Sequence, residues 1–71
     1  MKTFKIKNEI FYYEELVDSE DEANYTYSLY DKDRQYIASA IMNFRGMREI
    51  AKTFLTGDEE LLQQAINYYC Y

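Results

Sequence analysis

The 71-residue sequence contains no histidine, no proline and no tryptophan, and it has only two glycines and one cysteine. Without histidine, the commonest general acid–base residue is missing. A single thiol cannot supply the four ligands of a structural zinc site, and it excludes a disulfide within the chain. The two glycines form neither a phosphate-binding loop nor a nucleophile elbow. We therefore predict a protein that is not an enzyme and holds no cofactor.

Two acidic stretches, 18–22 and 31–35, place acids at alternate positions, as calcium-binding EF-hand loops do. Ala23 and Tyr36 stand where such a loop requires glycine, and neither stretch has glutamate at the twelfth position of the loop. We predict no dedicated metal site.

The length predicts a single domain, 1–71, with a thin stability margin. Aromatic packing by nine tyrosines and four phenylalanines, or self-association into a homodimer, would compensate for the small core. The basic N-terminus is followed by no apolar stretch of signal-peptide length, and no segment is long and apolar enough to cross a membrane. With its lone cysteine, the chain is predicted to be cytoplasmic and to have no membrane partner.

Alternating apolar residues predict strands in the first half of the chain. Apolar and polar residues alternate over 3–7 and again over 24–29. The stretch 9–17 has apolar residues on both faces, so it is expected to be a central strand or one whose second face meets a partner. The acidic stretch 18–22 fits a solvated loop.

The stretch 35–41 has two interpretations. It follows the polar, turn-forming run 31–34 and could return as the second arm of a hairpin. Alternatively, apolar residues at helical spacing would allow one long helix over 34–55. We favour the hairpin, because a tyrosine-rich strand needs a neighbour and Gly46 would cost a helix about 1 kcal/mol relative to alanine.

Two helices are predicted in the last third of the chain. The first begins after Gly46 and presents an apolar face over 47–55. The second spans 58–69, with Thr56 and Glu59 forming a reciprocal capping box at its start. The tyrosine-rich end, 68–71, is expected to dock on the protein.

Together these elements predict an α+β fold: an antiparallel sheet of three or four strands, packed on one face by two C-terminal helices. The apolar faces of the predicted elements define the expected core. Its members are Phe4, Ile6, Ile10, Leu29, Ile50, Phe54, Leu62 and Ile66.

Charge is distributed unevenly along the chain. The formal net charge is −5, from 13 acids and 8 bases, and the stretch 8–31 holds eight acids but no base. Tyrosines lie among these acids, and tyrosine gives a large contact area with little entropy loss. One interpretation is that the tyrosines belong to the core and the acids form a solvated face. The other, which we pursue, is that this composition binds a basic protein surface. The candidate partner-binding residues are Glu14, Glu15, Asp18, Glu20, Asp21, Glu22, Tyr12, Tyr13 and Tyr25.

The function expected from these features is protein–protein interaction. Its sharpest form is an inhibitor that fills the nucleic-acid groove of a nuclease or polymerase, with carboxylates in the positions of phosphates. Small acidic proteins of phages and mobile elements, including anti-CRISPR proteins, act as DNA mimics of this kind, and such a protein would work in the host cytoplasm. The negative charge disfavours direct nucleic-acid binding.

Two alternatives remain from the sequence. One is a regulatory or adaptor subunit of a cellular complex that binds without mimicry. The other is a nucleic-acid-binding regulator that uses Arg45, Arg48 and Lys52, which would share one helix face.

Overall fold

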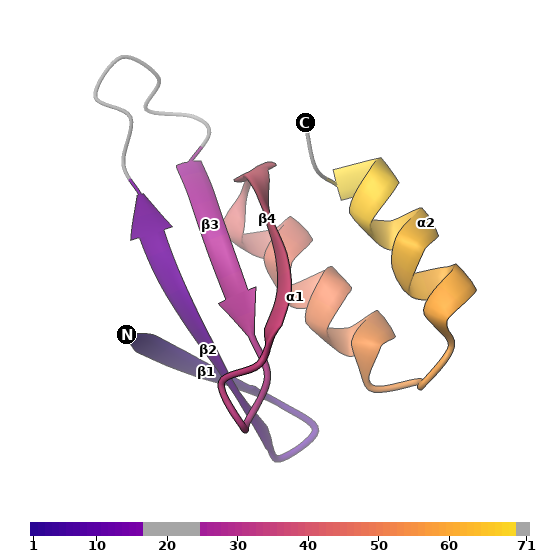
Figure 1. Ribbon diagram of the computed structural model, residues 1–71, viewed down its shortest axis with the longest axis horizontal. Coiled ribbons are helices and arrows are strands. Elements are labelled where there is room, and N and C mark those ends of the chain that lie inside the picture. The colour runs from indigo at the N-terminus through magenta and orange to yellow at the C-terminus, as the bar shows by residue number, and fades with distance from the viewer. Residues whose placement is uncertain (17–24, 70–71) are drawn as a thin grey trace.

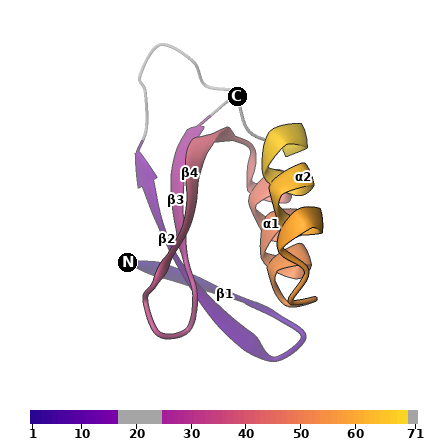
Figure 2. The same ribbon diagram turned by 45° about the vertical axis from the view of Figure 1, so that its right-hand side comes forward.

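The computed structural model describes residues 1–16 and 25–69. Four strands, β1 (Lys2–Ile6), β2 (Glu9–Leu16), β3 (Tyr25–Tyr30) and β4 (Tyr36–Met42), are followed by α1 (Phe44–Phe54) and α2 (Glu59–Tyr69). The strands form one antiparallel sheet in the order β1-β2-β3-β4. Both helices lie on the same side of the sheet (Figure 1 and Figure 2). The predicted α+β fold is confirmed.

Two turns that contain no glycine connect β1 to β2 and β3 to β4. Lys7 and Asn8 both have positive φ, 51° and 68°, which gives the two-residue turn that matches strand twist. In the turn between β3 and β4, the Asp31 carboxylate accepts hydrogen bonds from the backbone N–H groups of Asp33 and Gln35, at 2.9 and 2.8 Å. This turn returns the chain as β4, so the hairpin interpretation of 35–41 is confirmed and the single long helix is wrong.

The first helix begins earlier than predicted, at Phe44, because Asn43 caps it. The Asn43 side chain accepts a hydrogen bond from the backbone N–H of Gly46 at 2.7 Å. Gly46 lies buried in the first turn, and a Cβ atom there would be 3.1 Å from Cβ of Tyr69 on α2. The glycine therefore marks a close approach between the two helices and not a break before α1.

The capping box predicted at Thr56 is wrong, because α2 is capped by Asp58. The Asp58 carboxylate accepts from the N–H groups of Glu60 and Leu61, at 3.0 and 3.1 Å. The Thr56 hydroxyl instead lies 2.6 Å from the carbonyl of Thr53, to which it donates. Gly57, with a φ of 76°, turns the chain between the helices and so moves the cap from Thr56 to Asp58.

The core lies between the sheet and the helices. Of the eight expected members, Ile6, Leu29 and Ile50 are buried, whereas Phe4, Phe54, Leu62 and Ile66 are half-buried and pack against the buried cluster. The prediction for Ile10 is wrong, since its side chain is 39% exposed. Its neighbour Phe11, 1% exposed, takes that place and contacts Phe4 and Phe54, with ring centroids 5.6 and 6.0 Å away.

Candidate functional site

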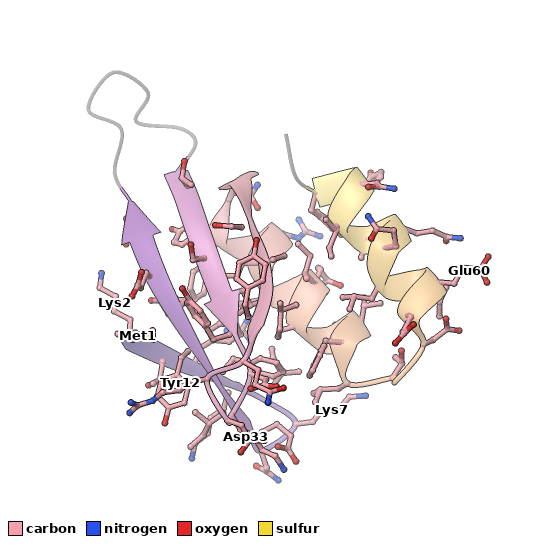
Figure 3. All side chains as sticks on the ribbon, viewed as in Figure 1. Met1, Lys2, Lys7, Tyr12, Asp33 and Glu60 are labelled. Atoms are coloured by element: carbon pink, nitrogen blue, oxygen red, sulfur yellow. The ribbon has the colours of Figure 1, made fainter. Side chains whose placement is uncertain are left out.

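The two faces of the sheet differ in what covers them, and Tyr12 and Tyr13 show the difference. Adjacent residues of a strand point to opposite faces. The Tyr13 ring packs under the helices, 5.7 Å from Phe4, 5.8 Å from Tyr27 and 5.6 Å from Phe44 between ring centroids. Tyr12 lies on the side of the sheet remote from the helices (Figure 3). We call that side the open face.

Three tyrosines form a line across the open face. Tyr12 of β2 is the register partner of Tyr30 of β3, which in turn is the register partner of Tyr36 of β4. The Tyr30 and Tyr36 rings meet edge to face, with centroids 6.1 Å apart. We call Tyr12, Tyr30 and Tyr36 the tyrosine row. Tyr36 is 63% exposed and the other two are half-buried, so the row presents aromatic surface to solvent.

Arg34 holds one end of the tyrosine row in place. Its guanidinium carbon lies 5.1 Å from the centroid of the Tyr12 ring, which is a cation–π contact. Arg34 has a φ of 62° in the loop between β3 and β4. This left-handed backbone is part of the turn that brings β4 back beside β3. The same turn therefore positions Tyr36 and Arg34.

The surroundings of the row are mixed in charge. On one side Lys5 is the register partner of the exposed Ile10. On the other side Glu14 is the register partner of Ser28, whose hydroxyl is 2.7 Å from the hydroxyl of Ser39. A base, an acid and hydroxyl groups around an aromatic centre resemble the polar rim and aromatic core of a protein-binding surface more than a phosphate-binding surface.

The structure does not bring the nine predicted partner-binding residues onto one surface. Tyr12 and Glu14 lie on the open face, whereas Tyr13 is half-buried and packs against the core from the helix side. Glu15 lies on the helix side and forms an ion pair with Lys2 at 3.2 Å. Tyr25 is the first residue of β3. Four residues fall outside the described residues: Asp18, Glu20, Asp21 and Glu22.

Three residues of the open face were missed by the sequence argument: Tyr30, Tyr36 and Arg34. Tyr30 shares the strand of Tyr27 and Leu29 but lies on its opposite face. The alternation over 24–29 was the available signal, because it gave Tyr30 the phase opposite to Leu29. The position of Tyr36 needed the register of β3 and β4, which shifts between Leu29 and Tyr30.

The net negative charge is concentrated in one segment. Four of the 13 acids and none of the eight bases lie in 17–24, so the remainder of the chain has nine acids and eight bases. That segment follows β2 and precedes β3. An interaction that depends on negative charge would therefore depend mainly on residues 18–22.

The bases proposed for nucleic-acid binding lie on α1. Arg45, Arg48 and Lys52 are all exposed, and Lys52 forms an ion pair with Glu49 at 3.5 Å. They do not adjoin the tyrosine row, because α1 covers the opposite side of the sheet (Figure 2). The three bases of α1 and the tyrosine row therefore do not form one single-strand-binding groove.

Within 1–16 and 25–69, no group of three or more His, Cys, Asp or Glu side chains is placed to hold a metal ion. Neither α1 nor α2 is long and apolar enough to span a membrane. No protein-family model, curated protein or solved structure matches this chain. Function is therefore inferred from the residues of the open face.

Proposed function

We propose that the protein acts by binding another protein through the open face of its sheet and has no catalytic activity of its own. The observation that carries this proposal is the tyrosine row on the face that the helices leave uncovered. Tyrosine and arginine are enriched among residues that dominate binding energy at interfaces. Tyr36 and the Arg34–Tyr12 pair give that combination in one place.

The row is also suited to binding because its geometry exists before any partner arrives. Its three side chains project from hydrogen-bonded strands, and Ser28 and Ser39 fix β3 to β4 beside it. Residues fixed in advance lose less conformational entropy on association. The open face is therefore a rigid platform, in contrast to a loop that must be ordered on contact.

The finer form of the proposal is an inhibitor of a nucleic-acid-processing enzyme, such as the nucleases countered by phage anti-defence proteins. The acids at 18–22 support it, because they give the protein most of its net negative charge. Such a charge speeds encounter with a basic groove and makes binding weaken as salt rises. In this form the tyrosine row anchors the complex and the acids compete with phosphates.

The test compares two sets of variants against one partner. Affinity capture followed by mass spectrometry identifies the partner, and its affinity is then measured for Tyr12→Ala, Tyr36→Ala and the triple reversal Glu20→Lys, Asp21→Lys, Glu22→Lys. We expect each tyrosine variant to weaken binding about thirtyfold, the equivalent of about 2 kcal/mol. Tyr68→Ala is the matched control, because Tyr68 is 78% exposed but lies on α2.

The two levels of the proposal have separate outcomes. A nuclease or polymerase that regains activity with the triple reversal supports the inhibitor. Loss of binding in the tyrosine variants alone, with no effect of the triple reversal, supports an adaptor without mimicry. Unchanged binding by Tyr12→Ala and Tyr36→Ala contradicts the open face as the contact surface. Tight, salt-sensitive binding to duplex DNA that requires Arg45, Arg48 and Lys52 would contradict both the inhibitor and the adaptor. It would indicate a nucleic-acid-binding regulator instead.

A further inference from the structure

The two edge strands of the sheet differ in how they are protected from pairing. Edge strands expose unpaired backbone groups, and proteins commonly protect them with lysine, proline or bulges. β1 carries Lys2 and Lys5, both exposed. β4, with the sequence YIASAIM, has no charge and no proline. Among the described residues it pairs only with β3, and its one irregularity falls at its start, beside Tyr36.

The helix layer extends farther than the sheet does. α1 packs against β1 and β3, whereas the main contact of α2 is with α1. In Figures 1 and 2 the sheet ends at β4, while the helix layer continues to α2. None of the residues of α2, all of which the structure describes, is buried, although α1 buries Met47, Ile50 and Ala51. The helix α2 thus lies beside the place where a fifth strand would pair with β4.

The side of α2 that packs toward the core is apolar but incompletely covered. Leu62 and Ile66 are half-buried against the core cluster, as is Phe54 at the end of α1. A hollow of about 260 Å³ opens between the helices, with Phe54 and Leu62 as apolar lining and Asp58 and Glu59 as acidic lining. A lysine or arginine side chain fits this chemistry, because its aliphatic stem packs on apolar surface while its charge meets a carboxylate.

We propose that β4 and α2 form a docking slot for an extended segment of another protein. The backbone of that segment adds a fifth strand to β4, and its alternate apolar side chains pack against Leu62 and Ile66. A lysine or arginine of the segment enters the hollow beside Glu59. The slot uses the backbone edge of β4 and the side of α2, whereas the tyrosine row uses side chains of the open face, and the two share only Tyr36. This inference therefore does not depend on the proposed function.

A second copy of this chain is a poorer occupant than an extended segment. Antiparallel pairing of two β4 strands about a twofold axis makes one continuous sheet with both helix layers on the same side. Because α2 continues past β4 (Figure 1), the helix layer of a second copy would have to share that space. A segment without a helix of its own at this position meets no such obstacle.

The test uses short random peptides displayed on phage and selected on the immobilised full-length protein. We expect the selected peptides to lack proline, to carry apolar residues at alternate positions and to contain one lysine or arginine. The tightest peptide is then synthesised and titrated while amide hydrogen exchange is followed by NMR. We expect the amides of β4 to become protected and the resonances of Leu62 and Ile66 to shift.

Two neighbouring acids provide a matched pair of variants. Glu59 and Glu60 are both exposed and both lie in the first turn of α2, but only Glu59 lines the hollow. Glu59→Lys should weaken the selected peptide about fivefold, the equivalent of about 1 kcal/mol for a surface ion pair, and Glu60→Lys less than about twofold. Equal effects of the two variants on peptide affinity would overturn the proposal that a basic side chain of the segment enters the hollow beside Glu59.

Two further results would also overturn the proposal. One is a selected peptide that leaves the β4 amides unprotected or that binds equally well after proline is placed at its alternate positions. The other is protection of β4 that rises with protein concentration in the absence of peptide, which would assign the slot to a second copy.

Discussion

On the helix-covered face of the sheet the aromatic rings pack against the core, whereas on the open face the tyrosine row meets Arg34 and solvent. Both faces are rich in the same residue types, and Tyr12 and Tyr13 are adjacent in the chain. The side chain of Tyr13 packs with Phe4, Tyr27 and Phe44, while that of Tyr12 contacts a cation. Aromatic content therefore identifies neither a core nor a binding surface until the phase of the strand is known.

The largest effect should come from the covered face. Phe11 is 1% exposed and contacts rings of both a strand and a helix. Phe11→Ala should reduce the free energy of unfolding by about 3–5 kcal/mol, enough to unfold much of a small domain. Chemical denaturation of the variant measures this loss. Tyr12→Ala, one residue away, should cost less than about 1 kcal/mol; equal costs would mean that the two faces do not differ.

The next effect concerns the layer that covers the face. A leucine at Gly46 must occupy space where even a Cβ atom would lie 3.1 Å from Tyr69 and 3.3 Å from the Asn43 side chain. Gly46→Leu should therefore destabilise the protein by about 1–3 kcal/mol, as overpacked sites do. Lys52→Leu, on the exposed face of the same helix, is the control. A stabilised Gly46→Leu variant in thermal melting would show that α2 is not held closely against α1.

A smaller effect should separate the observed cap of α2 from the predicted one. Asp58→Ala should lower stability by about 1 kcal/mol, because it leaves the N–H groups of Glu60 and Leu61 without their acceptor. Thr56→Ala should cost less, because its hydroxyl donates to the carbonyl of Thr53 and accepts from the N–H of Asp58, at 3.2 Å, and both partners precede the first residue of α2. Urea denaturation of both variants gives the comparison. A larger loss of stability in Thr56→Ala than in Asp58→Ala would show that Thr56 is the N-cap of α2.

The smallest effect belongs to the open face. Arg34→Gln removes the cation–π contact with Tyr12 and should cost about 0.5–1 kcal/mol at such an exposed site. Its effect on partner binding should be larger than its effect on unfolding, because Arg34 is part of the proposed contact surface. If Arg34→Gln is destabilised by more than Phe11→Ala, the main role of Arg34 is to stabilise the fold and not to contact a partner.

Much of the fold could be predicted from local sequence patterns. Alternation identified β1 and β3. The two-sided apolar pattern of 9–17 identified β2, and the polar run 31–34 correctly favoured a hairpin with β4 as its second arm. The core assignment failed at Ile10 because β2 is apolar on both faces. Periodicity alone cannot say whether Ile10 or Phe11 meets the helices, since that depends on where α1 packs. The prediction of the α2 cap failed for a conformational reason. The positive φ of Gly57 moves the start of the helix, so that Asp58 and not Thr56 caps it.

The candidate site was less accessible from sequence. Tyr12 was identified, but Tyr30 and Tyr36 become its neighbours only through the register of three strands. That register includes a shift between Leu29 and Tyr30 which no local pattern indicates. Glu15 and Tyr13 were grouped with Tyr12 by proximity in the chain, and strand geometry then separated them. Surfaces built across strands are in general hidden from arguments that follow one segment at a time.

The most direct measurement of the role of the open face is site-specific photocrosslinking inside cells that contain the protein. A photoreactive phenylalanine analogue replaces Tyr36 on the open face in one sample and Tyr68 on α2 in another, both positions being exposed. We expect the analogue at position 36 to crosslink one discrete partner, and we expect the analogue at position 68 not to crosslink that partner. Crosslinking of that partner from position 68 but not from position 36 would contradict the assignment of binding to the open face.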